Sequence, residues 1–315
     1  KKKTNFIIGD INVRKDWENA ILDQDAIIHL AAETGTGESM YDIYNYTNTN
    51  VSATALMLDV LTNSQHKIKK ILLSSSRAVY GEGMYKCKEQ AVIFPSSRND
   101  KDLQEGIYDF ISQSSNSKLI PIPTNEESHI LPTSVYAINK LNQEQLILLV
   151  AKNLNINTTV LRFQNVFGPG QQLYRIVPKT LIKSLLKNKI TLHGGGKSKR
   201  SFIYIEDACR ANLKVLLKGK IGETYHISTN KIVSIKELVK KISIKTNFSF
   251  KNLTKYSLDR KGKDHYYKLD SKKIRKQLNW KDKISLERGI HLTFIWIIKN
   301  FKYLKKQSLE YKHKS

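Results

Sequence analysis

The chain has 315 residues, 40% of them hydrophobic, which is enough for one large α/β unit or two smaller domains. It contains no run of about 18 apolar residues and no secretory leader, so we expect neither a membrane span nor export, and a cytoplasmic location. The formal net charge is +25, yet lysine outnumbers arginine by 43 to 10 and is scattered along the chain, which favours a solvated surface over a nucleic-acid interface.

The first half of the chain alternates between short apolar runs and helical patterns. The runs are rich in Ile, Val and Leu and lack strict alternation, which is typical of parallel strands buried on both faces. They lie at residues 5–11, 25–32, 69–76 and 158–166. The helical patterns lie at residues 14–22, 47–64 and 133–153. This order predicts an α/β fold with a doubly wound, Rossmann-like parallel sheet.

The second half has the pattern of a smaller, mostly helical domain. We expect a first domain over residues 1–166 and a second over residues 167–315. Helical patterns in the second lie at residues 177–188, 206–217, 234–245 and 285–300. Two strand-like segments within residues 202–230, FIYIED and ETYHIST, can return to the first sheet. Residues 84–131 contain several prolines and are expected to form a long inserted loop, which in a compact unit is usually functional or locally structured.

A tyrosine and a lysine stand four residues apart in SVYAINK, residues 134–140, where a helix is expected to begin. On a helix the two side chains share a face, and an ammonium close to a phenol favours the phenolate, so Tyr136 can act as a base assisted by Lys140. Alone, this spacing is weak and also suits a solvated helix face. Its context is SSSRAVYG, residues 74–81, which leaves Ser76 at the carboxyl edge of the sheet, where open α/β sheets bind ligands.

Seven motifs in the chain follow the order found in the extended short-chain dehydrogenases/reductases that act on nucleotide sugars. They are GDI (9–11), HLAAETGTGESM (29–40), SSSRAVYG (74–81), YAINK (136–140), RFQNVFGPGQ (162–171), RSFIYIEDA (200–208) and DRKGKD (259–264). The chain therefore resembles the NAD-dependent epimerase/dehydratase family. The resemblance implies NAD as cofactor, a nucleotide-diphosphate sugar as substrate, and a homodimer formed through the helices near 47–64 and 133–153, with no nucleic-acid or membrane partner.

The resemblance also implies roles for individual residues. Ser76, Tyr136 and Lys140 would form the catalytic set, and Tyr136 and Lys140 would also touch the cofactor. The other cofactor-binding residues would be Asp10, Ile11, Leu30, Ala31, Ala32 and Thr49. The second domain would bind the nucleotide sugar, with Asn165, Arg200 and Arg260 holding the sugar or the diphosphate. Arginine suits a diphosphate because its planar fork donates two hydrogen bonds at once.

The residues that follow the strand at 69–76 bear on the reaction. In the similar sugar 4,6-dehydratases this strand ends in Thr-Asp-Glu before VYG, and those acids eliminate water; the positions here are Ser76, Arg77 and Ala78. Decarboxylases of the family resemble a pattern with glutamate at the Ala78 position. The resemblance therefore favours 4-epimerisation through a transient 4-keto sugar, with Tyr136 as the base. A dehydratase or keto-sugar reductase of the same family, and a non-catalytic remnant of it, stay open as alternatives.

The insert resembles that of a 4-epimerase subgroup that includes dTDP-L-rhamnose 4-epimerase-like proteins. In that subgroup a Cys-x-x-His and a Cys-x-x-Cys can together bind zinc, and the four positions here are Cys87, Gln90, Ser112 and Ser115. A zinc site of this kind needs about four N or S ligands, so we predict no metal. The two cysteines of the chain, Cys87 and Cys209, are expected to be free thiols.

One expected motif is absent from the 315 residues. A Rossmann protein holds the diphosphate with Gly-x-x-Gly-x-x-Gly at its first strand-to-helix turn, and this spacing occurs nowhere in the chain. In the resembling family this unit precedes GDI by about 30 residues or somewhat more, while eight residues precede Gly9. We therefore expect the chain to lack the first strand, its glycine turn and the second strand.

Overall fold

The computed structural model describes residues 4–89, 91–96, 107, 109–112, 116–257 and 266–310. The chain divides into two compact units. The first consists of Lys1–Gly81, Ile130–Phe163 and Asn212–Tyr225, and the second of Glu82–His129, Gln164–Ala211 and His226–Ser315. Residues 84–129 of the expected insert thus fall in the second unit.

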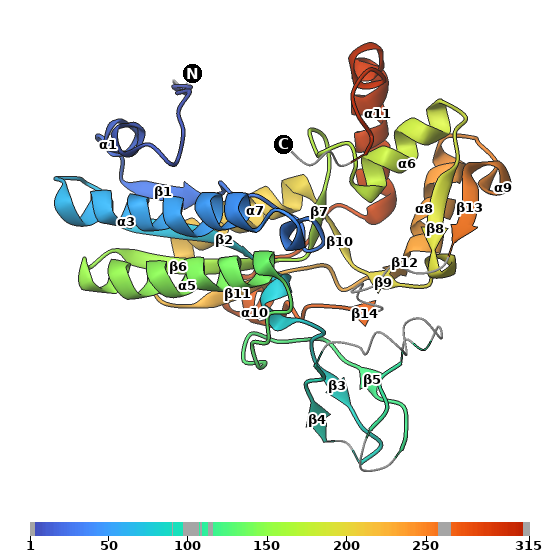
Figure 1. The fold of residues 1–315 in the computed structure, drawn as a ribbon, viewed down its shortest axis with the longest axis horizontal. Coiled ribbons are helices and arrows are strands. Elements are labelled where there is room, and N and C mark those ends of the chain that lie inside the picture. Colours follow the sequence, from blue (N-terminus) through green and yellow to red (C-terminus); the bar gives the residue numbers. More distant parts are fainter. Residues whose placement is uncertain are drawn as a thin grey trace. The chain divides into compact units, whose positions relative to one another are not determined.

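A four-stranded sheet forms the centre of the first unit (Figure 1). Its strand order is β1 (Ala26–His29), β2 (Lys70–Ser76), β6 (Asn157–Phe163) and β11 (Thr224–Ile227). β1 pairs with β2 in parallel, and β2 pairs with β6 in parallel along its whole length. Parallel neighbours need a crossover between them, and helices supply it here. The predicted α/β fold with a Rossmann-like parallel sheet is confirmed.

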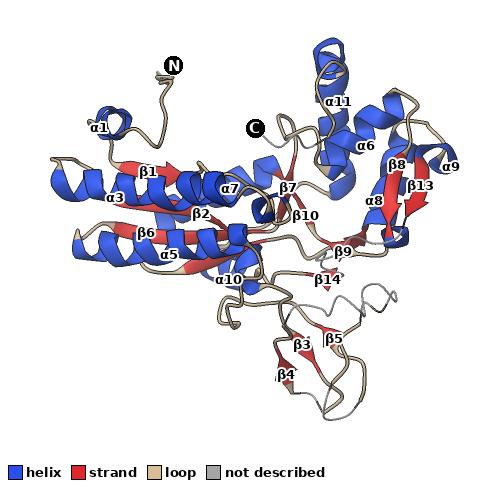
Figure 2. Ribbon diagram, viewed as in Figure 1, coloured by secondary structure: helices blue, strands red, loops and turns tan. Residues whose placement is uncertain are grey.

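Helices of the first unit cover this sheet and bury its apolar residues. α1 (Arg14–Ile21) precedes β1, α3 (Ala53–Asn63) leads from β1 to β2, and α5 (Val135–Asn153) leads from β2 to β6. Figure 2 shows α3 and α5 running along the strands, and both contribute to one core. In that core Leu61 of α3, Leu73 of β2, Ile147 of α5 and Val160 of β6 are buried together. Burial of such side chains stabilises the unit by about 2 kcal/mol each.

The helix predicted over residues 47–64 is present in three pieces. α2 (Ile43–Thr47) is followed by a π-helical turn, η2 (Asn48–Ser52), and then by α3. A π-helical turn inserts one extra residue into the helical repeat and is frequent at functional sites. The turn contains Thr49, one of the residues expected to line the cofactor.

The strand predicted at residues 5–11 is wrong. Residues 4–10 form neither helix nor strand, and Phe6, Ile7 and Ile8 are 88%, 60% and 88% exposed. A strand exists only where a neighbouring strand accepts its backbone hydrogen bonds, and none of the described strands pairs with this run. The apolar composition is therefore not sufficient to make it a strand.

The second unit combines helices with four small sheets. The helices are α6 (Ile176–Leu185), the first half of α7 (Ile205–Lys218), α8 (Ile235–Lys245), α9 (Phe250–Leu253), α10 (Lys272–Leu278) and α11 (Leu286–Leu304). The strand groups are β7 (Asn165–Phe167) with β10 (Phe202–Tyr204), β8 (Ile190–His193) with β13 (Thr254–Ser257), β9 (Lys199–Arg200) with β12 (Val233–Ser234) and β14 (Tyr266–Tyr267), and β3 (Tyr85–Lys86) with β4 (Val92–Ile93) and β5 (Ile120–Pro121). Its core gathers Phe167, Leu181, Leu238, Ile290 and Ile297. Among the described helices of both units, none combines the length and apolar character that a membrane span requires.

The two segments expected to return to the first sheet behave differently. ETYHIST contains β11, which lies next to β6 in the four-stranded sheet. FIYIED contains β10, which pairs with β7 in a separate two-stranded sheet, so its expected return to the first sheet is wrong. The reason is that β7 follows β6 after a single residue, Gln164, and offers β10 its own parallel edge.

Asp207 holds several segments of the second unit together. Its side chain is fully buried and accepts hydrogen bonds from the backbone N–H groups of Lys283 at 2.8 Å and Ile284 at 2.9 Å. Arg210 donates to the same carboxylate, one turn along α7, and also to Glu206 at 2.7 Å. Asp207 therefore joins the start of α7 to the chain that precedes α11.

We expect Asp207→Ala to lower the free energy of unfolding by about 3 kcal/mol, because two backbone N–H groups and a guanidinium lose their acceptor. Glu206→Gln is the matched control, since Glu206 also pairs with Arg210 but its side chain is 59% exposed; its cost should be about 0.5 kcal/mol or less. Urea unfolding of both variants measures the two losses. Equal losses would contradict the role given to Asp207.

Candidate active site

Ser76 is the last residue of β2 and begins a tight turn. Its hydroxyl accepts a hydrogen bond from the backbone N–H of Ala78 at 3.2 Å and so caps the short 3-10 helix η3 (Arg77–Tyr80). The turn closes at Gly81, where φ is +58° and a Cβ would stand 2.3 Å from the backbone oxygen of Leu131. No side chain fits such an approach. The glycine that ends SSSRAVYG is therefore required by the backbone of the turn that Ser76 begins.

Tyr136 lies in the first turn of α5. Ser134 caps this helix by accepting from the N–H of Ala137 at 3.2 Å, and the hydroxyl of Ser39 accepts from the N–H of Tyr136 at 3.0 Å. Ser39 is fully buried and belongs to the short 3-10 helix η1 (Glu38–Met40). Two N–H groups that the helix start cannot satisfy by itself thus have side-chain partners. These bonds fix the point at which the chain enters α5, while the side chain of Tyr136 stays half-buried.

Lys140 follows Tyr136 by one helical turn and is only 2% exposed. Its Nζ donates to Oε1 of Gln143, and Nε2 of Gln143 donates to Oγ1 of Thr54 at 2.7 Å. Burial lowers the pKa of Lys140 to about 8, although the negative charge of Glu144 acts in the opposite direction. Near neutral pH most of the Lys140 side chains therefore still carry a proton. The helix presents a buried ammonium next to the turn that contains Tyr136.

His29 ends β1 and completes this polar cluster. Its Nε2 lies 3.0 Å from Oγ1 of Thr54 and 3.3 Å from Nε2 of Gln143. Burial lowers the pKa of His29 to about 4, and the positive charge of Lys140 lowers it as well. The ring is therefore neutral at neutral pH, and Lys140 carries the positive charge of this group of side chains.

The residues expected to line the cofactor come from the segment after β1 and from η2. Asn50, a fully buried residue of η2, joins the two: its Oδ1 accepts from the N–H of Glu33 at 2.9 Å, and its Nδ2 donates to the carbonyl of Glu33 at 3.1 Å. This two-point bridge brings residues 30–32 close to the turn that carries Thr49. All four expected residues are at least partly accessible: Leu30, which is 64% exposed, and Ala31, Ala32 and Thr49, which are half-buried.

Asp10 and Ile11 form the turn that leads into α1. Oδ1 of Asp10 accepts from the N–H of Asn12 at 2.8 Å, and the N–H of Asp10 donates to Asp16 at 2.7 Å. The carbonyl of Ile11 accepts from the indole N–H of Trp17 at 2.8 Å. Asp10 remains exposed, so its carboxylate both stabilises this turn and is open to a ligand.

Of the residues expected to hold the substrate, Asn165 and Arg200 belong to the second unit and Arg260 lies outside the described residues. Nδ2 of Asn165 donates to the carbonyl of Ser201 at 3.1 Å. Phe202, two residues after Arg200, is the pairing partner of Asn165 in the β7–β10 sheet. Strand pairing thus brings Asn165 and Arg200 into the same part of the second unit.

The positions considered for zinc are only partly described. Cys87 and Ser112 are buried, while Gln90 and Ser115 fall on residues that the structure does not describe. In the described part of the chain, no three His, Cys, Asp or Glu side chains gather as a metal site would require. Cys87 and the exposed Cys209 are both free thiols.

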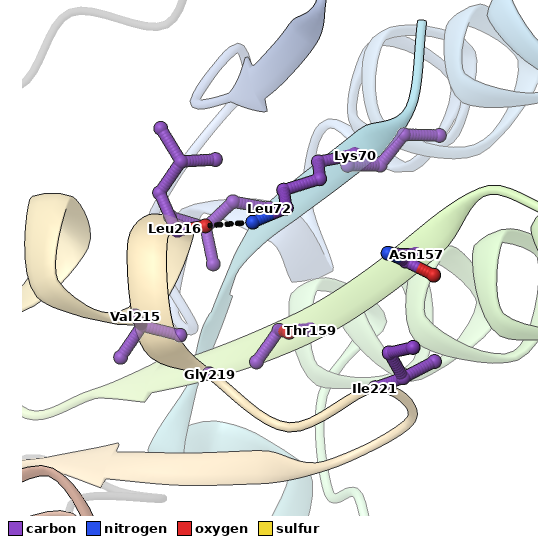
Figure 3. A pocket seen from close by; sticks show the side chains of 9 residues that line it. Lys70, Leu72, Asn157, Thr159, Val215, Leu216, Gly219 and Ile221 are labelled. Carbon is purple, nitrogen blue, oxygen red and sulfur yellow. Dashed lines mark hydrogen bonds between the residues drawn. The ribbon is translucent and has the colours of Figure 1, made fainter.

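A cavity of about 200 Å³ lies in the first unit, away from these residues. Figure 3 shows side chains of β2, β6 and the end of α7 around it, with Nζ of Lys70 donating to the carbonyl of Leu216 at 3.0 Å. Lys70 and Asn157 are the first residues of β2 and β6, whereas Ser76 is the last of β2. Leu72 is the lining residue of β2 nearest to Ser76, and four residues at about 3.3 Å each separate the two by about 13 Å along the strand, so the cavity is not the candidate site.

Several residues that organise the site were not expected from the sequence. They are Ser39, Asn50, Gln143, Glu144 and Arg162, all of them buried. Glu144 and Arg162 form a salt bridge in the core. The sequence does contain a signal for this salt bridge: Arg162 interrupts the apolar run TTVLRFQNV, and a charge in a buried strand requires a partner of opposite charge.

We expect Lys140→Met to change the pH dependence of stability. The folded pKa of Lys140 is about 8 and its ordinary value is 10.5, so the unfolded chain binds more protons between these pH values. The free energy of unfolding of the wild type should therefore rise relative to the variant, by up to about 3 kcal/mol, as pH increases from 8 to 10.5. Urea unfolding at several pH values measures this. Lys152→Met, an exposed lysine on the same helix, is the control, and a difference that does not vary with pH would contradict the expectation.

The sequence matches the NAD dependent epimerase/dehydratase family over residues 1–100 and 103–228. The dTDP-D-glucose 4,6-dehydratase of Dictyostelium discoideum is 30% identical over an alignment of 312 residues, which covers 89% of this chain and 65% of that protein. The dTDP-L-rhamnose 4-epimerase of Burkholderia thailandensis is 29% identical over an alignment of 303 residues, which covers 94% of this chain and 82% of that protein. The chain thus spans slightly less than two thirds of the Dictyostelium protein.

The fold agrees with this match. DesIV, a dTDP-glucose 4,6-dehydratase from Streptomyces venezuelae whose structure contains NAD, superposes with a TM-score of 0.76 at 23% identity, covering 94% of this chain and 80% of DesIV. The match over most of the chain confirms the family and the NAD cofactor that the seven motifs implied. This chain belongs to the NAD dependent epimerase/dehydratase family.

Proposed function

We propose that this chain is the catalytic body of an NAD-dependent nucleotide-sugar 4-epimerase that works through a transient 4-keto sugar. The observation that carries the proposal is the arrangement of β2, η3 and α5. Ser76 ends β2, Tyr136 and Lys140 occupy the first two turns of α5, and α5 contacts both β2 and η3. All three side chains belong to elements that meet at the carboxyl edge of the sheet.

The residues present suit the nicotinamide ribose half of NAD. A buried ammonium and hydroxyl groups at the end of a parallel strand are donors that fit a ribose, and the small residues after β1 leave the backbone open to a nucleotide. NAD, when bound, would supply the hydride acceptor for carbon 4 of the sugar and the hydride donor to its opposite face. The residues proposed to hold it are Asp10, Ile11, Leu30, Ala31, Ala32, Thr49, Tyr136 and Lys140.

The proton is moved by the chain's own side chains. The phenol oxygen of Tyr136 removes the proton from the sugar O4 hydroxyl and gives it back when the epimer forms. The ammonium of Lys140 stabilises the phenolate that this role requires, and its pKa of about 8 keeps it protonated at neutral pH. The hydroxyl of Ser76 shares a hydrogen bond with O4 and orients it toward Tyr136.

The turn after β2 favours epimerisation over dehydration. Elimination of water needs an acid and a base in addition to Tyr136. The two positions after Ser76 carry Arg77 and Ala78, and neither side chain has a carboxyl group. The reaction left to these residues is oxidation at carbon 4 followed by return of the hydride.

The substrate in this proposal is a nucleotide-diphosphate sugar. Arg200 and Arg260 would hold the diphosphate, because a guanidinium pairs with two phosphate oxygens at once. Asn165 would bind the sugar from the same part of the second unit as Arg200. The names of the relatives in Dictyostelium and Burkholderia, which act on dTDP-sugars, support this class of substrate.

A homodimer through the helices of the first unit is part of the proposal. α5 exposes Ile138 and Leu149, and α2 exposes Ile43 and Tyr44. Exposed apolar side chains on adjacent helices are typical of a surface that another subunit covers.

Tyr136→Phe is expected to lower turnover by about 1,000-fold, because no phenol is left to exchange the O4 proton. The assay supplies NAD and a panel of UDP-, dTDP-, GDP- and CDP-sugars, and uses both this chain and the chain with any residues that its gene encodes before Lys1. Tyr303→Phe, an exposed tyrosine, is the control. A Tyr136→Phe variant with most of its activity would remove the mechanism, and a 4-keto-6-deoxy product would make the enzyme a dehydratase.

The 315-residue chain by itself is expected to bind NAD weakly and to turn over slowly, because its sequence has no Gly-x-x-Gly-x-x-Gly to hold the diphosphate. Titration calorimetry with NAD measures the dissociation constant. Micromolar affinity would show that other residues replace the glycine turn. No binding even with the upstream residues present would favour a non-catalytic remnant.

A further inference from the structure

The helix that carries Tyr136 and Lys140 is tied to the sheet by a buried ion pair. Glu144 on α5 and Arg162 on β6 are 3% and 4% exposed. We propose that Glu144, held by Arg162 and Ser75, is a positioning residue that fixes the depth and rotation of α5, so that Tyr136 and Lys140 keep their place relative to Ser76. Its effect on catalysis rests on the proposed function; its effect on α5 does not.

Glu144 accepts hydrogen bonds from two adjacent strands. Nε of Arg162 donates to Oε1 at 3.0 Å and Nη2 donates to Oε2 at 2.5 Å, a two-point contact that fixes the plane of the carboxylate. The hydroxyl of Ser75 also donates to Oε1. Ser75 and Arg162 are pairing partners in the β2–β6 register, so both side chains point to the same face. The carboxylate therefore binds the residue that immediately precedes Ser76.

Arg162 extends the connection to the turn after Ser76. Its third nitrogen, Nη1, donates to the hydroxyl of Tyr80, and its guanidinium carbon lies 4.8 Å from the centroid of the Tyr80 ring. Tyr80 is 1% exposed and ends η3, the turn that begins at Ser76. One guanidinium thus joins α5 to the strand before Ser76 and to the turn after it.

Glu144 is placed to act on Tyr136 and Lys140 through the helix itself. Tyr136, Lys140 and Glu144 follow one another at intervals of four residues, which puts them on neighbouring turns of one helix face. The turns are joined by backbone hydrogen bonds, so a shift of the helix at Glu144 displaces the two preceding turns as well. A misplacement of about 1 Å can lower a reaction rate about 100-fold.

The ion pair is better explained by alignment than by stability. Apolar residues of similar volume often stabilise a core as well as a buried ion pair does. Hydrogen bonds are directional, however, whereas apolar contacts allow a helix to slide or rotate. The charged and titratable groups around Glu144 are Lys140 on α5, Arg162 on β6 and Tyr80 on η3, and the charge of Glu144 also favours the protonated form of Lys140 by raising its pKa.

The test compares Glu144→Gln, Arg162→Met and the double variant in the full chain. Each single variant leaves one buried charge unpaired, so both should unfold at lower urea concentration than the wild type. The double variant has no unpaired charge and should regain most of this loss. The alignment of α5 on the sheet should not be restored in the double variant. Amides of residues 135–141 should exchange hydrogen faster than in the wild type, and kcat should stay about 100-fold lower with little change in KM.

A double variant that regains stability and also shows wild-type exchange at residues 135–141 would overturn the positioning role, whether or not substrate is converted. A wild-type chain that converts no nucleotide sugar would count against the proposed function alone, because hydrogen exchange requires neither NAD nor a sugar. The two failures can therefore be told apart.

Arg162→Lys covers the case in which the double variant does not fold. It keeps the charge but loses the planar fork, so exchange at residues 135–141 should still be faster than in the wild type, and unchanged exchange would again overturn the proposal. Asp59→Asn is the control, because it breaks the exposed Arg14–Asp59 ion pair in the same unit. Such exposed pairs contribute little, and exchange at residues 135–141 should not change.

Discussion

The register of β2 against β6 is the constraint on which the rest of the site depends. The pairing runs from Lys70 with Asn157 to Ser76 with Phe163, and it sets Ser75 directly beside Arg162. A shift of one strand by one residue would turn its side chains to the opposite face of the sheet, so Ser75 and Arg162 would no longer share a face. Glu144 could then no longer bind both Ser75 and Arg162, and α5 would lose its attachment beside the turn that Ser76 begins. The position of the helix is thus a consequence of how two strands pair.

The core beneath the site is polar, and its polar groups satisfy one another. The amide of Gln143 points its oxygen at Lys140 and its nitrogen at Thr54, while Thr54 donates to the carbonyl of Asn50 at 2.7 Å. Each hydrogen bond in this chain of side chains has a defined donor and acceptor, so the cluster permits few alternative arrangements. A buried ammonium can be kept here because its neighbours are a neutral histidine, an amide oxygen and, one turn away, a carboxylate.

Local signals in the sequence predicted the sheet and the elements that carry the proposed catalytic residues, whereas partners distant along the chain were not predictable. The run at 25–32 and the run at 5–11 are both rich in apolar residues, but among the described strands only the first has a partner. For the same reason the sequence could not decide whether FIYIED returns to the first sheet, since pairing depends on which edge is free in three dimensions. Asn50 and Glu33 are 17 residues apart and follow no fixed spacing, so their bridge could be found only in the folded chain. Arg162 in an apolar run did predict a buried acidic partner, but only the packing of α5 on the sheet shows that this partner is Glu144.

The free side of β1 has a consequence for how the 315-residue chain behaves in solution. In the part of the chain that the structure describes, β1 pairs with β2 alone, and exposed apolar side chains stand nearby at Ile28 and Leu30. An open strand edge beside apolar surface is a template for self-association. Mutual repulsion between chains of formal net charge +25 opposes it. That repulsion reaches only about 8 Å at physiological ionic strength and less in stronger salt. Buffers of low ionic strength should therefore keep the 315-residue chain dispersed, and the high-salt washes common in purification should favour its aggregation.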